Sequence, residues 1–296
     1  MQQTTPVVKD LVLVGGGHTH VAVLRRFGMR PLPGLRLTLI TRDVHTPYSG
    51  MLPGYIAGHY DYDECHIDLG PLARFAGARL YHAPVTGLDL DARLVHVEGR
   101  PPVHYDLLSI NTGSTPGVAR AEGAREHAVP VKPIDSFLAH WDRVVARVRE
   151  HREPQRIVVV GGGAGGVELL LAVQHRLRAL LTEAGDDPGR LSFTLLTRGA
   201  RILESHGAGV AQRFERVLGE RGVDVRTGHE VVAVTADRVV PRDGAPVPAD
   251  IVLWVTGAAA PQWPREAGLA VDAGGFIRVD DHLQSLSHPG VFAAGD

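Results

Sequence analysis

The chain has 296 residues, of which 44% are hydrophobic and 22% charged, and its formal net charge at pH 7 is -2. A chain of this length can bury a sizeable core and commonly divides into two domains. The near-neutral charge gives no electrostatic reason to expect a nucleic acid or an anionic membrane as a partner. The single cysteine, Cys65, excludes an internal disulfide and any Cys-x-x-Cys redox pair.

The N-terminal segment has no basic stretch followed by an apolar one, so the sequence predicts no secretory signal. The longest apolar run, residues 157–173, is interrupted by glycines and by Glu168. This pattern is typical of a strand, a turn and a helix rather than of a membrane-spanning helix. We therefore expect a cytoplasmic protein.

Three segments recur later in the chain in the same order, which indicates an internal duplication. Residues 11–17 match 157–163, residues 35–42 match 191–198, and residues 105–113 match 249–257. Strands that alternate with helices indicate parallel sheets with right-handed crossovers. The sequence thus predicts an α/β protein with two Rossmann-like dinucleotide-binding domains.

Helix signals follow both glycine turns. The first copy predicts a helix at residues 19–27, ended by Gly28 and Pro31, and the second copy predicts one at 165–183. A further helix at 135–150 is expected to lead into the second copy.

The second glycine turn carries a complete G-x-G-x-x-G pattern in Gly161, Gly163 and Gly166. Such a turn lets the backbone approach a dinucleotide pyrophosphate, whose charge meets the unpaired N–H groups of the helix N-terminus. The pattern predicts that this turn binds a dinucleotide.

The first turn has Gly15 and Gly17 but carries His20 in place of the third glycine. The third glycine normally permits close packing of helix and strand, so the helix could sit slightly further out. Alternatively, His20 faces the ligand and adds a donor. Both interpretations keep Gly15, Gly17 and His20 as cofactor-binding candidates.

The second strand of such a unit usually ends in an acidic residue that binds the adenosine ribose. Both copies instead have Thr-Arg, namely Thr41-Arg42 and Thr197-Arg198. Without the carboxylate, NADPH is expected as readily as NADH. Arg198 either pairs with the 2′-phosphate or is a solvated loop arginine.

The order of these motifs resembles that of the pyridine nucleotide-disulfide oxidoreductase superfamily, in particular its disulfide-free members related to type II NADH dehydrogenase. The resemblance covers essentially the whole chain, including the segments that end at Gly113 and Gly257 and the terminal Val-Phe-Ala-Ala-Gly-Asp296. It implies FAD at the first turn and NAD(P)H at the second, with Gly113 and Gly257 near the cofactors. It also implies that Asp296 binds the ribityl chain of FAD.

The resemblance further implies a domain division. Residues 1–120 plus 262–296 are expected to form the FAD-binding domain, and residues 121–261 an inserted NAD(P)H-binding domain. Relatives continue beyond the Asp296 position into an interface domain, so we expect a truncated chain. Homodimer contacts and any peripheral membrane contact would lie in that absent part.

Two stretches, residues 15–28 and 46–58, look like the flavoprotein domain found fused ahead of selenide, water dikinase. In that subfamily a histidine replaces the third glycine, which would make His20 a family feature. Association or fusion with selenide, water dikinase is therefore one expected partnership.

The chain departs from thiol-dependent relatives at one position. Single-cysteine reductases of peroxides or persulfides carry the cysteine before a Gly-Met pair, whereas Ser49 stands there in this chain. A serine cannot form a sulfenate or accept flavin electrons as a thiolate does. We expect Cys65 to be structural.

These features predict an FAD-dependent NAD(P)H:acceptor oxidoreductase that passes electrons to a quinone or another small acceptor. The resemblance implies that Glu168 orients the nicotinamide and flavin. Lys132, one of two lysines in the chain, is a candidate cation near the flavin. The alternative is a flavin-binding accessory or sensor domain that serves a selenophosphate-synthesising enzyme. The histidines show no metal-ligand spacing, and we predict no metal.

Overall fold

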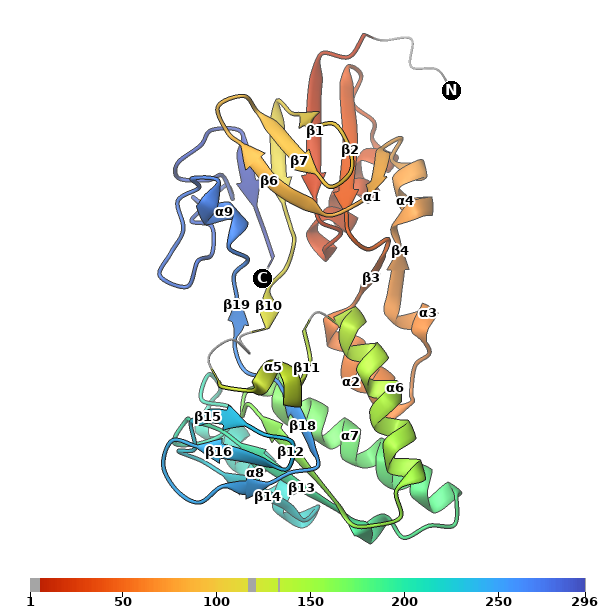
Figure 1. The fold of residues 1–296 in the computed structure, drawn as a ribbon. Helices are drawn as coiled ribbons and strands as arrows, with labels where there is room; N and C mark the ends of the chain where they lie inside the picture. Colours follow the sequence, from red (N-terminus) through yellow and green to blue (C-terminus); the bar gives the residue numbers. More distant parts are fainter. Residues whose placement is uncertain (1–5, 117–120, 133, 296) are drawn as a thin grey trace. The chain divides into compact units, whose positions relative to one another are not determined.

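The computed structural model describes residues 6–116, 121–132 and 134–295 (Figure 1). Asp296, to which the resemblance gives the ribityl chain of FAD, lies outside the described residues. The chain divides into two compact units, which we describe separately. One unit holds the chain up to Tyr48, then His66–Thr115, and the chain from Ala259 onward. The other holds Ser49–Cys65 and Pro116–Ala258.

The first unit is built on a five-stranded parallel sheet in the order β20-β9-β1-β2-β5. Its strands are β1 (Lys9–Val14), β2 (Leu35–Thr41), β5 (Arg79–His82), β9 (Leu107–Ile110) and β20 (Val291–Ala293). Alternate side chains of β1 enter different cores, as the period of a strand requires. Leu13 packs with the helices α1 (His18–Met29) and α4 (Leu69–Phe75). Val12 and Val14 pack on the other face with the antiparallel sheet of β6 (Val85–Asp89), β7 (Leu94–Val97) and β8 (Val103–His104).

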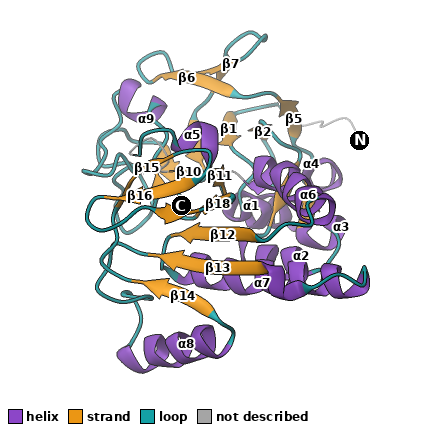
Figure 2. Ribbon diagram, turned by 60° about the horizontal axis from the view of Figure 1, so that its bottom comes forward, coloured by secondary structure: helices purple, strands orange, loops and turns teal. Residues whose placement is uncertain are grey.

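The second unit repeats this plan with a parallel sheet in the order β11-β18-β12-β13-β14. Figure 2 shows β12, β13 and β14 as neighbouring strands. The strands are β11 (Val129–Pro130), β12 (Gln155–Val160), β13 (Leu191–Leu196), β14 (Val223–Arg226) and β18 (Ile251–Trp254). One face packs against α2 (Leu52–Ala57), α6 (Ile134–Glu150), α7 (Ala164–Glu183) and α8 (Ala208–Glu220). The other face packs against the antiparallel sheet of β15 (Val231–Val234), β16 (Arg238–Pro241) and β17 (Val247–Pro248).

Four strands therefore have the same order in both units, β9-β1-β2-β5 and β18-β12-β13-β14, whereas the edge strand comes last in the chain in the first unit (β20) and first in the second (β11). In both units the three-stranded antiparallel sheet is inserted at the same place, between β5 and β9 and between β14 and β18. This confirms the predicted α/β fold with two Rossmann-like domains.

The helix predictions need one correction. The α6 and α7 helices begin within one residue of their expected starts and end where expected. The α1 helix, however, passes through Gly28 and ends at Met29. A Cβ on Gly28 would lie 2.3 Å from the ring of Phe75 on α4. Gly28 therefore lies where two helices pack closely. A glycine at such a contact cannot be told in the sequence from a glycine that ends a helix.

The remaining elements are short. They are β3 (His45–Pro47), β4 (His66–Asp68), β10 (Thr115–Pro116), β19 (Ala258–Ala259), α3 (Tyr62–Cys65), α5 (Ala124–His127), α9 (Trp263–Glu266) and the 3-10 helices Ser49–Met51 and Pro188–Arg190. Within the described ranges, no helix combines the length and apolarity needed to cross a bilayer.

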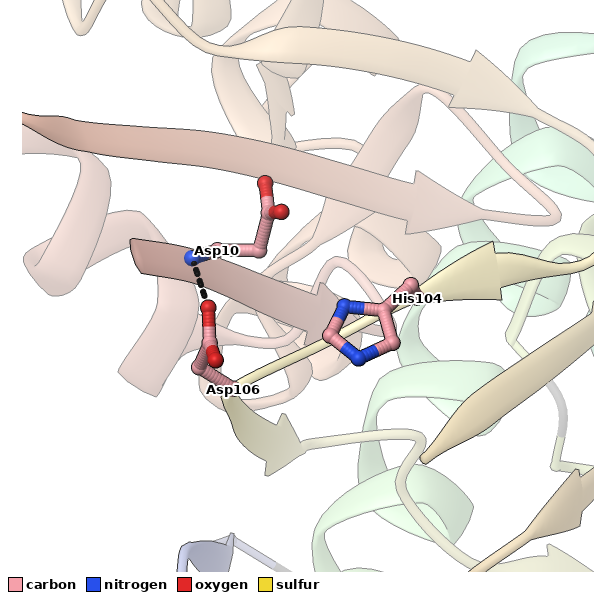
Figure 3. Close-up of side chains that lie close together, drawn as sticks. All are labelled: Asp10, His104 and Asp106. Atoms are coloured by element: carbon pink, nitrogen blue, oxygen red, sulfur yellow. Dashed lines mark hydrogen bonds between the residues drawn. The ribbon is translucent and has the colours of Figure 1, made fainter. Parts of the chain in front are cut away.

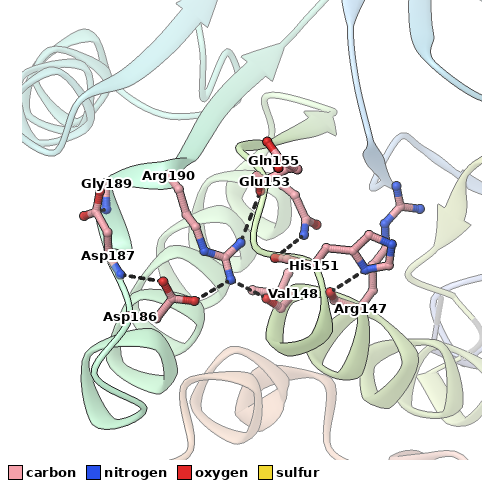
Figure 4. Close-up of polar contacts among 9 residues, drawn as sticks. All are labelled: Arg147, Val148, His151, Glu153, Gln155, Asp186, Asp187, Gly189 and Arg190. Atoms are coloured by element: carbon pink, nitrogen blue, oxygen red, sulfur yellow. Dashed lines mark hydrogen bonds and ion pairs between the residues drawn. The ribbon is translucent and has the colours of Figure 1, made fainter.

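A buried arginine ties the amino-terminal end of β13 to the end of α6 (Figure 4). Arg190 is 9% exposed, and its Nη2 donates to the carbonyl oxygen of Val148 at 2.5 Å. The same nitrogen lies 3.2 Å from a carboxylate oxygen of Asp186, and Nη1 donates to the Glu153 carbonyl oxygen at 3.4 Å. The charge of Arg190 is thus buried together with its hydrogen-bond acceptors.

Replacing Arg190 with Met should lower the free energy of unfolding by about 2–4 kcal/mol, because buried carbonyl oxygens lose their charged donor. Urea or thermal unfolding of the full chain measures this. Arg238→Met is the matched control, since the Arg238–Asp237 pair has side chains 51% and 58% exposed. Such exposed pairs contribute little, so the control should unfold like the unchanged protein. Equal effects of the two substitutions would contradict the interpretation of Arg190.

Candidate functional site

The first glycine turn follows β1 and approaches the neighbouring strand β9 closely. Gly15 has a φ of +94°, and its N–H donates to the Ile40 carbonyl oxygen at 2.8 Å. A Cβ at this position would lie 2.1 Å from the carbonyl oxygen of Asn111. Both the backbone conformation and this contact therefore require glycine.

The second turn, after β12, has the same construction. Gly161 has a φ of +130°, and its N–H donates to the Leu196 carbonyl oxygen at 2.8 Å. A Cβ on Gly161 would lie 2.8 Å from the carbonyl oxygen of Val255. Each turn thus runs from the carboxyl end of a central parallel strand into a helix N-terminus, the usual place for a dinucleotide.

The two turns differ at their second glycine. Gly163 is the N-cap of α7, and no described atom lies within 4 Å of a Cβ placed on it. Gly17 is the N-cap of α1, but a Cβ placed there would lie 1.6 Å from Oδ1 of Asn111. An amide therefore fills the space beside the first turn that is open beside the second.

The turns differ again at the third position. A Cβ on Gly166 would lie 1.8 Å from the Gly161 carbonyl oxygen, so α7 packs directly on its turn. His20 takes this place in the first unit and is completely buried. Its Nδ1 lies 2.6 Å from the Gly15 carbonyl oxygen, and its Nε2 lies 2.9 Å from the Ser109 hydroxyl. Since a carbonyl only accepts, Nδ1 carries the proton and Nε2 accepts from Ser109.

His20 therefore supports the turn from inside the protein, which agrees with the packing interpretation rather than with a direct contact to ligand. Burial lowers the pKa of His20 to about 4, and the hydrogen bond to Gly15 opposes this only in part. The imidazole is neutral at neutral pH, as its two hydrogen bonds require.

We call His20, Ser109 and Asn111 the polar layer of the first turn. The register of the two sheets places Leu253 where Ser109 stands, and Val255 follows β18 as Asn111 follows β9. The corresponding layer of the second turn is therefore apolar. Ser109 and Asn111 are not candidates from the sequence motifs alone. The signal that would have found them is the polar side chain at each of these positions where the other repeat has an apolar one, which appears when the two repeats are aligned.

A carboxylate lies near the end of the second strand in each unit, although the Thr-Arg pairs at these strand ends do not indicate one. Thr41 is buried and donates to the Asp43 carbonyl oxygen at 2.8 Å, while Arg42 pairs with the Asp43 carboxylate at 2.7 Å. In the second unit Arg198 is exposed, and the Glu204 carboxylate accepts from Ala200 N at 3.0 Å. Asp43 and Glu204 thus bring an acidic group to each strand end despite the Thr-Arg sequence.

Gly113 belongs to a further feature of the first unit, a cavity of about 320 Å³. Its lining includes Thr112 and Gly113 after β9 and Ala294 and Gly295 after β20. The cavity therefore lies at the carboxyl ends of two parallel strands, as the glycine turn does. Gly257, the counterpart of Gly113, is exposed and has no described atom within 4 Å of an added Cβ.

The candidate catalytic residues both belong to the second unit. Glu168 is exposed on α7, five residues beyond Gly163. Lys132 is half-buried in the segment that follows the carboxyl end of β11. Both therefore follow strands that end at the same edge of the sheet as the second glycine turn.

Cys65 is buried at 4% exposure, and burial, together with the nearby Glu64 and Asp61 carboxylates, raises the pKa of its thiol. A raised pKa keeps the thiol protonated and a poor nucleophile. Ser49 lies in an exposed turn of 3-10 helix.

Among the described residues, Asp10, His104 and Asp106 form a group with metal-ligand side chains (Figure 3). Asp10 and Asp106 lie at the amino ends of β1 and β9, away from the glycine turn, and His104 ends β8. Asp106 Oδ2 accepts from Asp10 N at 2.7 Å, and the Asp10 carboxylate is paired with Arg36. In the second unit Asp250 accepts from Arg156 N at 2.9 Å in the same way. Strand capping thus accounts for this group of carboxylates.

Comparison with known proteins agrees with this geometry. The family model described as pyridine nucleotide-disulphide oxidoreductase matches residues 9–296. An NADH dehydrogenase-like protein of Mycobacterium tuberculosis is 28% identical over 246 residues, which cover 80% of this chain and 59% of that protein. The type II NADH:quinone oxidoreductase of Haemophilus influenzae is 23% identical, and the match covers 98% of this chain and 73% of that protein. The chain thus spans about three fifths of the length of the mycobacterial relative.

The structure of the water-forming NADH oxidase from Lactobacillus brevis, bound to NADH, superposes with a TM-score of 0.79. The two sequences are 22% identical, and the matched region covers 98% of this chain and 62% of the oxidase chain. At this identity the likeness concerns the fold.

Because the pKa of His20 falls from 6.5 to about 4 on folding, unfolding at acid pH is coupled to proton uptake. The stabilising contribution of the neutral His20 is complete above pH 6.5 and is lost as the pH falls towards 4. Its loss between pH 7 and pH 5 should lower the free energy of unfolding by about 2 kcal/mol. Urea unfolding of the unchanged protein and of His20→Gln at both pH values measures the difference. Parallel losses in the two proteins would contradict the assignment.

Proposed function

Because the chain belongs to the pyridine nucleotide-disulphide oxidoreductase family, we propose that it is an FAD-dependent NAD(P)H:acceptor oxidoreductase. One observation carries the proposal above all. Two glycine turns of the same construction each connect a central parallel strand to a helix N-terminus. A protein that holds two dinucleotides can bring a flavin and a nicotinamide together.

We assign FAD to residues 1–120 plus 262–296 and NAD(P)H to residues 121–261. Support for this division comes from the compact units, whose boundaries lie at residues 115/116 and 258/259, although Ser49–Cys65 belongs to the second unit. The fit of the cofactors is supported by the positive φ of Gly15 and Gly161, which brings each turn close to the neighbouring strand, and by the open space beside Gly163.

When bound, the two cofactors supply the hydride chemistry, and the protein supplies binding, orientation and charge. The unpaired N–H groups at the start of α1 and α7 would hold the pyrophosphates. Glu168 orients the rings, and Lys132 supplies a positive charge near the flavin. Asp296 binds the ribityl chain. Gly113 and Gly257 let the backbone pass close to the cofactors.

Nucleotide preference depends on two opposing charges. Arg198 favours the 2′-phosphate of NADPH, whereas Glu204, whose carboxylate bonds to the same loop, favours the ribose hydroxyls of NADH. We therefore propose that the second unit accepts both NADH and NADPH.

The proposed acceptor is a quinone or another small molecule, because a quinone is named in the activity of one relative described above. The link to selenide, water dikinase rests on the resemblance of residues 15–28 and 46–58. An accessory flavin-binding role beside a selenophosphate-synthesising enzyme is kept as a proposal on that basis. A homodimer is a separate proposal, which rests on the interface domain that relatives have beyond the Asp296 position. A yellow protein that NAD(P)H does not reduce would favour the accessory role.

The direct test loads the chain with FAD and adds NADH or NADPH under anaerobic conditions. Bleaching of the flavin band near roughly 450 nm within seconds is expected. A protein that takes up no FAD would overturn the proposal.

Gly163→Asp separates the two nucleotide sites. The position has a φ of -74° and open space, and aspartate is a favoured N-cap, so folding should be unaffected. The added charge should repel the pyrophosphate and raise the NAD(P)H concentration for half-maximal reduction roughly tenfold or more. FAD content should not change.

Gly207→Asp is the matched control, because Gly207 is the N-cap of α8 and also has open space. This variant should be reduced normally. Loss of FAD from Gly163→Asp would contradict the assignment of NAD(P)H to the second turn.

Cys65→Ser should leave the rate of flavin reduction within about twofold of the unchanged protein, because a buried, protonated thiol takes no part in the proposed reaction. Stopped-flow absorbance measures this rate. A loss of turnover without loss of FAD would revive a thiol-dependent mechanism.

A further inference from the structure

A cavity of about 280 Å³ lies in the first unit near the amino ends of β2 and β5. Arg36 and Arg79 line it from the first two positions of these strands, whereas the glycine turn follows the carboxyl end of β1. The loop between β7 and β8, residues 98–102, contributes Arg100 and two prolines. A cavity of this size is at the lower end of the range for ligand pockets, so it suits a small molecule.

The lining of this cavity is basic. Three arginines line it, namely Arg36, Arg79 and Arg100, and Asp10 is the one acidic residue among the described residues that do so. The Arg100 guanidinium lies 5.4 Å from the centre of the Tyr81 ring. Neither Arg79 nor Arg100 has an ion-pair partner in the described part of the chain. The cavity therefore carries an excess of positive charge that an anion can neutralise.

The third arginine, Arg36, is held in place by Asp10. Its Nε and Nη2 both donate to the Asp10 carboxylate, the latter at 2.6 Å. Its Nη1 has no hydrogen-bond partner within the described ranges. These bonds fix the plane of the guanidinium and leave N–H groups unused. A planar guanidinium of this kind matches the oxygens of a phosphate group.

The second unit shows that the fold does not require these arginines. The three arginines of the cavity correspond, in order, to Ser192, Asp224 and Gly244. The first two matches follow from the strand registers, and the third from the β16–β17 loop, which is as long as the β7–β8 loop. Asp224 also pairs with Arg226 at 2.8 Å, which balances the charge there. The excess of positive charge is thus a property of the first unit and not of the shared architecture.

We propose that this cavity binds the phosphate group of a small phosphate ester. A dianionic phosphate neutralises the two arginines that have no carboxylate partner, and its oxygens accept from guanidinium groups in pairs. An ester fits better than the free ion, because Pro101, Pro102 and Val103 line the same cavity and offer apolar contacts to a carbon chain. The cavity lies at the opposite ends of the strands from the glycine turn, so this site is separate from the dinucleotide site.

The test titrates the full chain with glycerol 3-phosphate and with inorganic phosphate by calorimetry, at constant ionic strength and about pH 7.5, where a phosphate ester is mostly dianionic. FAD and NAD⁺ are present, so that the dinucleotide sites of the proposed function are filled. Glycerol 3-phosphate should bind more tightly than inorganic phosphate. Arg79→Asp, which copies Asp224, should weaken its binding roughly tenfold or more, because a charged donor becomes a repelling carboxylate. Arg100→Gln removes a charge without reversing it and should weaken binding roughly threefold.

Arg213→Asp is the matched control. Arg213 is an exposed arginine on α8 of the second unit and has no ion-pair partner among the residues described. The substitution makes the same change in net charge, but it should leave both affinities within about twofold. Arg79 is exposed as well, so the thermal midpoint of Arg79→Asp should match that of the unchanged protein. If Arg79→Asp fails to fold, Arg79→Gln gives the comparison with a neutral side chain.

Three results overturn the inference. The first is the absence of binding of either probe at millimolar concentration. The second is equal weakening by Arg79→Asp and Arg213→Asp, which would show an effect of net charge alone. The third is inorganic phosphate binding as tightly as the ester. None of these results bears on the reduction of the flavin by NAD(P)H, so a failure here is distinguishable from a failure of the proposed function.

Discussion

The close approach of a glycine to the neighbouring strand is the constraint on which both nucleotide turns depend. At Gly15 and at Gly161 the backbone turns with positive φ, directly against the carbonyl oxygen of Asn111 or Val255. Any side chain at either glycine would separate the turn from the strand behind it. Because the turn is held there, the first N–H groups of α1 and α7 point out at the carboxyl edge of each sheet, where an anion can bind them.

The two copies keep this constraint and differ in what stands behind it. In the second unit the third glycine packs on the turn without intervening atoms, and its neighbours Leu253 and Val255 are apolar. In the first unit the ring of His20 fills that gap and replaces direct packing with two hydrogen bonds. A histidine at a glycine position thus keeps the turn in place when it is neutral and has Ser109 as a partner.

Much of the fold could be predicted from the sequence because the repeat is visible in it. Three matched segments fix the central strands, and the glycines mark the turns. The sequence could not show which way His20 points, since a histidine beside a ligand and one beneath a loop leave the same pattern. Gly28 misled for a similar reason, because a helix stop and a close helix contact both favour glycine. Asp43 follows a strand and carries no motif, so only its place in space reveals it, whereas Asn111 becomes visible when the two repeats are aligned position by position.

The polar layer also makes the first turn depend on pH in a way that the second does not. At neutral pH His20 is uncharged and both of its ring nitrogens are hydrogen-bonded, so the layer holds the turn. As the pH falls, the unfolded chain takes up a proton on this imidazole that the buried side chain resists, and the stability of the folded unit decreases. The corresponding positions of the second unit are Gly166, Leu253 and Val255, which carry no titratable side chain. The same turn geometry is therefore held by a pH-sensitive layer in one unit and by an apolar, pH-insensitive one in the other.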